Sequence, residues 1–138
     1  MFLVYKPEGA DERRWTYEPE KLLSSEAEAI ERKTGWTYEE FGIQLVKGST
    51  IARRALLWVL LKRDDPTLRH EQIDIPVGVV RTDYNRTELQ AIRDAAAKDT
   101  DLTDAERDGA LEQLEKMLAE LPEEDAPKAP ESDAGSND

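Results

Sequence analysis

The hydrophobic positions of this chain fall into short runs whose period changes along the sequence. The first two runs, MFLVYK and RRWTYE, are rich in aromatic and β-branched residues and flank PEGADE, a stretch typical of turns. This pattern predicts an N-terminal β-hairpin with strands near residues 2–6 and 13–18. A lone hairpin is marginally stable in water, so we expect it to pack on the rest of the chain. The candidate buried side chains are Phe2, Val4, Trp15 and Tyr17.

The apolar spacing then changes to that of amphipathic helices. Ser25 and Glu28 have the spacing of a capping box, which predicts a helix that ends at Thr34-Gly35. Thr37 and Glu40 repeat that spacing and predict a second helix. Around this second start, Trp36 and Phe41 occupy the positions of a hydrophobic staple, and Gly48 is expected to end the helix in a left-handed conformation.

A third helix is predicted over IARRALLWVLLKR, starting at Ser49 or Thr50 and ending before Pro66. A helix this apolar is usually the central one of a bundle. The expected buried face consists of Ile51, Ala55, Trp58 and Val59, widened by Leu56, Leu60 and Leu61. Its basic residues, Arg53, Arg54, Lys62 and Arg63, are interpreted as a solvated rim in which Glu39 and Glu40 balance the first two.

The segment QIDIPVGVV alternates in a way that indicates an extended stretch or a short strand. Pro76 restricts that strand to the edge of a sheet, where it can add to the N-terminal hairpin. Two further capping boxes follow, Asn85 with Glu88 and Thr103 with Glu106, and they predict a fourth helix and a fifth over 104–121.

The fifth helix carries leucines at a 3-4-3 spacing, which makes a narrow apolar stripe on a highly charged helix. One interpretation packs this stripe inside the chain's own bundle. The alternative is that it binds a helix of a partner protein, which makes these four leucines the candidate partner-binding residues. They are Leu111, Leu114, Leu118 and Leu121.

Residues 122–138 contain no aromatic and no β-branched residue, so they cannot bury enough apolar surface to fold and are predicted to be disordered. The predicted fold class is therefore α+β and mostly α. It comprises a β-hairpin and three-helix core domain over 1–82, a C-terminal helical segment over 83–121, and the acidic tail.

Charge is distributed unevenly along the 138 residues. The formal net charge is −12, of which residues 1–98 contribute −1 and residues 99–138 contribute −11. An acidic surface repels phosphate backbones, so nucleic-acid binding is not expected. The simplest role for the acidic part is to keep the protein dispersed, and the alternative is a specific charge-reading role.

The sequence gives no sign of catalytic chemistry. There is no cysteine, and the single histidine, His70, lies in the polar stretch TLRHEQ with no nucleophile tied to it by a recognisable motif. We therefore expect neither an enzyme nor a metal or cofactor site. No apolar run approaches the roughly 20 residues that span a bilayer, and MFLVYKPEG lacks the features of a secretory signal. An intracellular protein without membrane contact is the simplest interpretation.

The order of elements over residues 2–80 resembles the tail assembly chaperones of long, non-contractile-tailed phages, especially those of actinobacteria. The resemblance lies in the hairpin FLVYKPEG…RRWTYEP and in LLSSEAEAIERKTG, WTYEEFG, LVKGS, ALLWVLLKRDDPTLR and IDI, taken in succession. The acidic helical remainder is similar more loosely.

This resemblance implies a function in tail assembly. It implies that the chain binds the tape measure protein, keeps it soluble and promotes tail tube assembly in the cytoplasm of the host bacterium, and that it is absent from the mature virion. Tail tube subunits and a longer, frameshifted product would be further partners, with this chain as the short product; self-association is left open. The rival hypothesis is a structural virion protein, either a head–tail connector or a tail component.

Overall fold

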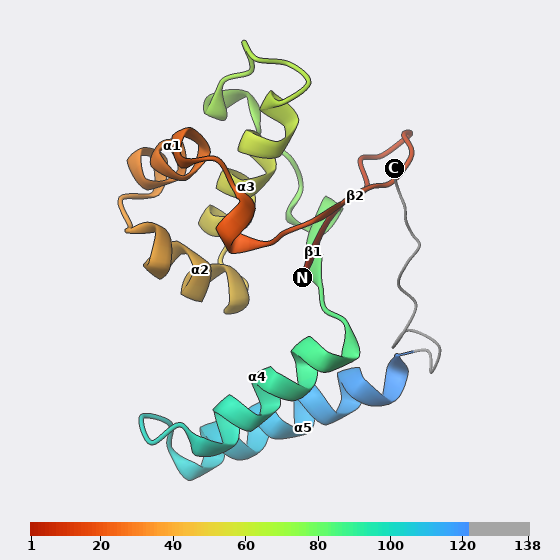
Figure 1. Cartoon of the computed structure of the whole chain (residues 1–138). Helices are drawn as coiled ribbons and strands as arrows, with labels where there is room; N and C mark the ends of the chain where they lie inside the picture. The colour runs from red at the N-terminus through yellow and green to blue at the C-terminus, as the bar shows by residue number, and fades with distance from the viewer. Residues whose placement is uncertain (122–138) are drawn as a thin grey trace. The chain divides into compact units, whose positions relative to one another are not determined.

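The computed structural model describes residues 1–121, and the predicted disorder of 122–138 lies outside them. The chain divides into two compact units, Met1–Asp83 and a second that begins at Tyr84. The described residues form five α-helices and one three-stranded antiparallel sheet, so the predicted α+β, mostly α fold is confirmed (Figure 1).

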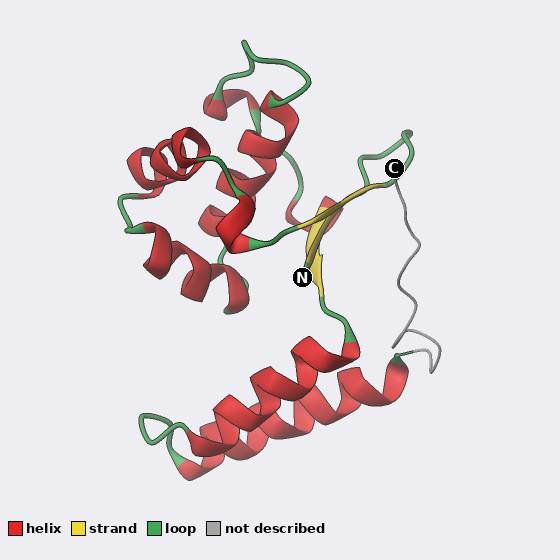
Figure 2. Cartoon of the chain, viewed as in Figure 1, coloured by secondary structure: helices red, strands yellow, loops and turns green. Residues whose placement is uncertain are grey.

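The sheet of the first unit contains the predicted hairpin and one later strand. Strands β1 (Phe2–Tyr5) and β2 (Arg13–Thr16) pair antiparallel, and β3 (Val80–Asp83) joins the other side of β1 in the order β2-β1-β3 (Figure 2). The expected third strand therefore exists, but it begins only after the 3₁₀ turn Val77–Val79 that follows Pro76. The alternation in QIDIPVGVV located the edge strand several residues too early.

Of the four hairpin side chains that were predicted to be buried, Val4 and Tyr17 are buried, whereas Phe2 and Trp15 are half-buried, and the four are divided between the two faces of the sheet. Leu3 lies opposite Trp15, and Leu3, Trp15 and Tyr17 pack in or against the helical core. Phe2 and Val4 lie on the other face, because adjacent residues of a strand point to opposite sides. Val4 is buried but lies outside the core cluster, and Phe2 is half-buried.

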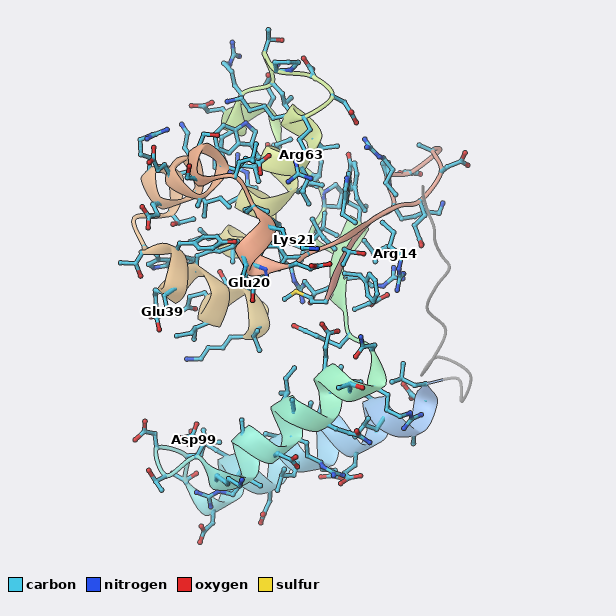
Figure 3. The ribbon with its side chains drawn as sticks, in the orientation of Figure 1. Arg14, Glu20, Lys21, Glu39, Arg63 and Asp99 are labelled. Carbon is cyan, nitrogen blue, oxygen red and sulfur yellow. The ribbon has the colours of Figure 1, made fainter. Side chains whose placement is uncertain are left out.

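Charged side chains on the outer face of the sheet pair with one another across the strands. The Arg14 guanidinium lies 4.6 Å from the centroid of the Phe2 ring and 3.3 Å from the Asp83 carboxylate (Figure 3). Arg81 bonds the same carboxylate at 3.1 Å. Since Arg14 and Arg81 are the two cross-strand neighbours of Val4, their aliphatic stems are placed to cover this side chain.

Three helices follow the hairpin and pack together: α1 (Ser24–Thr34), α2 (Tyr38–Val46) and α3 (Thr50–Lys62). Gly35 and Gly48 have φ of 79° and 87° and end α1 and α2 as predicted, because this left-handed conformation suits glycine.

The predicted start of α1 is wrong. Glu26 rather than Glu28 satisfies the first turn, by accepting a hydrogen bond from the Leu23 N–H at 3.0 Å. The same carboxylate receives two hydrogen bonds from Arg63 at the end of α3, at 2.8 and 2.9 Å. This pairing is the main reason that the pKa of Glu26 is lowered.

The predicted caps of α2 and α3 are confirmed in their hydroxyl parts. The Thr37 hydroxyl accepts from the Glu40 N–H, and the Ser49 hydroxyl accepts from the Ala52 N–H, both at 3.1 Å. The carboxylate half of the first box is wrong, because Glu40 accepts instead from the Gln44 side chain at 2.7 Å.

Helix α3 is the centre of the first unit, as predicted. Seven of its residues are buried, and α1, α2, β1 and β3 all contact it. Ile51 was expected on the buried face but is 55% exposed, and Ala52 is buried in its place. The large side chains that are fully buried in this core are Leu3, Ile30, Phe41, Leu45, Leu56 and Leu57.

The second unit is a pair of helices, α4 (Arg86–Lys98) and α5 (Asp104–Glu120), that pack on each other. Both predicted capping boxes are present in full. The Asn85 and Thr103 side chains accept from the N–H groups of Glu88 and Glu106, and both glutamates accept in return. Leu89 of α4 is buried.

Candidate partner-binding site

The four candidate leucines, three in α5 and Leu121 directly after it, differ in their exposure. Leu118 is buried, whereas Leu111, Leu114 and Leu121 are half-buried. The carbonyl of Leu118 also accepts a hydrogen bond from Arg86 at 3.3 Å, which ties the end of α5 to the start of α4. Part of the stripe is thus used inside the second unit. That these leucines bind a partner stays a prediction.

His70 makes contacts that stabilise the fold. Its ring meets the Trp58 ring edge-on at a centroid distance of 5.5 Å, and its backbone carbonyl accepts a hydrogen bond from Arg54 at 3.2 Å. Burial lowers the pKa of His70, and the charges of Arg54 and Lys33 lower it further. Among residues 1–121, no three acidic or histidine side chains are grouped closely enough to hold a metal ion.

Large aliphatic side chains are exposed in the first unit. Two of them, Ile43 and Val46, are three residues apart on α2 and so share a face of that helix. Their exposed fractions are 45% and 46%, those of Leu23 and Ile51 are 63% and 55%, and that of Val77 is 65%.

Val77 belongs to a groove of about 270 Å³ in the same unit. One wall is the start of α3, where Thr50, Arg53 and Arg54 share a face because they are spaced i, i+3 and i+4. The other wall is the chain that leads into β3. It contributes Ile73, Asp74, Ile75, Val77 and Val80.

The two arginines of the groove have no carboxylate partner among residues 1–121. Arg54 donates to the backbone carbonyls of Ile73 and His70, which fixes the second wall of the groove to α3. Arg53 donates only to the Thr82 hydroxyl, at 3.4 Å, and its Nε is buried without a hydrogen-bond partner in the described chain.

This arrangement corrects the interpretation of Arg53 and Arg54 as a solvated rim balanced by Glu39 and Glu40. Both arginines are half-buried, and neither pairs with those glutamates. The correction has a physical cause: the chain returns along α3 at residues 70–75 and presents carbonyl groups to Arg54. One feature of the sequence could have indicated this arrangement: two adjacent arginines interrupt a helix that is otherwise apolar.

The arrangement suits recognition of an apolar chain. The groove offers aliphatic side chains for hydrophobic contact and the Arg53 guanidinium, which has no carboxylate partner among residues 1–121, for a carboxylate or a carbonyl. No helix within residues 1–121 combines the length and the apolar character needed to cross a bilayer.

Comparison with protein families, with curated proteins and with solved structures found no match to this chain.

Proposed function

We propose that this chain is a tail assembly chaperone of a long, non-contractile-tailed phage. In this role it binds the tape measure protein in the host cytoplasm, keeps it soluble and promotes assembly of the tail tube around it. The observation that carries the proposal is the groove of about 270 Å³ beside α3. It lies within the first unit, whose residues 2–80 also bear the resemblance to such chaperones.

The proposed role requires that the client be kept soluble before assembly. A tape measure protein is a long chain whose apolar stripes are exposed until the tail tube covers them, so a holder must offer apolar surface of its own. The exposed aliphatic side chains of the first unit supply such surface. The net charge of −12 makes loaded complexes repel one another.

Co-expression tests the proposal. The tape measure protein of the same phage is produced with and without this chain, and its soluble fraction is measured. We expect the soluble fraction to rise several-fold and the two proteins to co-purify. Failure of both would contradict the proposal.

Analysis of mature particles separates the proposal from its rival. A head–tail connector or tail component stays in the virion, whereas a chaperone leaves before assembly ends. We expect this chain to be absent from purified virions by quantitative mass spectrometry. Presence at a fixed copy number would favour the structural virion protein.

A further inference from the structure

The outer edge of β3 presents backbone groups that its own sheet does not use. The Lys6 N–H donates to the Val79 carbonyl at 2.8 Å. In an antiparallel ladder, hydrogen-bonded pairs alternate with pairs that make no such bonds. Val80 and Thr82 therefore form non-hydrogen-bonded pairs with residues of β1, and their backbone N–H and C=O groups point away from β1.

Most of these outward groups have no partner in the described chain. The Val80 N–H donates to the Val77 carbonyl. The Val80 C=O and both backbone groups of Thr82 have no hydrogen-bond partner among residues 1–121. An edge strand with free N–H and C=O groups is a template for another strand.

The groove adjoins this edge rather than the edge of β2. Val80 is part of its lining, and Thr82 is bonded to Arg53 at 3.4 Å. The side chains of Val80 and Thr82 thus share the sheet face that looks toward α3. A strand added at this edge would place its own side chains beside them, since directly opposite residues share a face.

We propose that the outer edge of β3 is a docking site for an extended segment of a partner protein. The segment adds as an antiparallel strand, with an acidic residue opposite Thr82 and an aliphatic residue two positions later, opposite Val80. The carboxylate meets Arg53, which has no carboxylate partner in residues 1–121, and the aliphatic side chain enters the groove.

This docking site does not depend on the proposed function. A peptide titration tests the strand edge, whereas co-expression with the tape measure protein tests the chaperone role. Either proposal can fail while the other holds.

The direct test is a titration of the ¹⁵N-labelled full chain with a capped heptapeptide, Lys-Thr-Glu-Thr-Ile-Thr-Lys. Backbone amide shifts report both affinity and position. We expect saturable shifts centred on Thr82 and Val80, and an affinity at least 5-fold weaker when glutamine replaces the peptide's glutamate. Shifts that lie elsewhere, equal affinity for the two peptides, or no binding would overturn the proposal.

Two variants assign the contacts. Arg53→Gln should remove the preference for the glutamate peptide, whereas Arg69→Gln, which removes an exposed arginine without an ion pair in the described residues, should retain it. If Arg53→Gln retains the preference, Arg53 is not the recognition residue and the proposal fails. If this variant does not fold, the peptide pair alone decides.

The backbone contact has its own matched pair of variants. Thr82→Pro removes the outward N–H without touching the ladder to β1, and Thr82→Val keeps that N–H. We expect binding at least 5-fold weaker for the proline variant than for the valine variant. Equal binding would overturn strand addition as the mode of docking.

Discussion

Trp58 joins the core of the first unit to the chain that follows α3. Its side chain is 5% exposed, and its indole N–H donates to the Leu68 carbonyl at 3.0 Å. The Lys62 ammonium lies 4.9 Å from the centroid of its ring. A single side chain therefore combines burial, a hydrogen bond and a contact with a cation.

Truncation of Trp58 should be strongly destabilising. Trp58→Ala is expected to lower the free energy of unfolding by about 3–5 kcal/mol, because it leaves a large cavity and an unpaired carbonyl. Denaturant unfolding measures this loss, with Trp58→Phe as a control that keeps most of the volume. A loss below about 1 kcal/mol would contradict the burial of this residue.

His70 should make the protein less stable in mild acid. Its pKa is lowered in the folded chain from 6.5, chiefly by burial, so folding favours the neutral ring. The corresponding stability is complete above pH 6.5 and is lost as the pH falls through the folded pKa. We expect the free energy of unfolding to decrease between pH 7.5 and 5, and to decrease less in His70→Gln. Identical pH profiles for the two proteins would contradict this account.

At the scale of elements, most local signals were predicted well, and the exceptions are the capping box at Ser25 and the carboxylate half of the one at Thr37. The hairpin strands, the glycines that end α1 and α2, and the full capping boxes at Asn85 and Thr103 depend on residues close in sequence, and the structure confirms them. Such features need only local hydrogen bonds and backbone preferences.

Features that depend on distant segments were predicted less well. The inward face of the hairpin depends on where α3 packs, and so the sequence suggested Phe2 where the core uses Leu3. The roles of Arg53 and Arg54 depend on the return of residues 70–75 along α3. The groove forms because residues 70–75 run back along α3, and no local pattern in the sequence predicts it.

Two tyrosines connect the hairpin to α2. Their hydroxyl oxygens are 2.8 Å apart, and the Tyr38 hydroxyl donates to the Pro19 carbonyl at 2.9 Å. Tyr38 therefore accepts from Tyr17. Tyr38 also stacks on Phe41 with ring centroids 5.8 Å apart. Burial is the largest cause that raises the pKa of both tyrosines.

This pair should limit stability in alkali. A raised folded pKa means that the stability from the neutral phenols is complete below their unfolded pKa of 10.0 and is lost as the pH rises above it. We expect the free energy of unfolding to decrease above pH 10, with a smaller decrease in Tyr17→Phe. Denaturant unfolding between pH 8 and 11 measures this, and an unchanged slope in the variant would exclude the pair as a cause.

At the scale of the whole molecule, the first unit contains its own core. Every residue of the core cluster lies within Met1–Asp83, including the strand β3 that closes the sheet. A unit with its own hydrophobic core is expected to fold alone.

Residues 1–83 expressed as a separate fragment should therefore unfold cooperatively. Circular dichroism and thermal melting are the measurements, and the fragment should keep the helix and sheet signals of this unit. A fragment without a cooperative transition would show that the second unit is needed for the fold of the first.

We propose above all that this chain holds an aggregation-prone client in solution. The most direct measurement is light scattering after denatured tape measure protein of the same phage is diluted into buffer with the purified full chain. The account predicts that scattering is suppressed at near-stoichiometric amounts of the chain, and that serum albumin at equal mass does not suppress it. Scattering that rises equally with the chain and with albumin would contradict the claim.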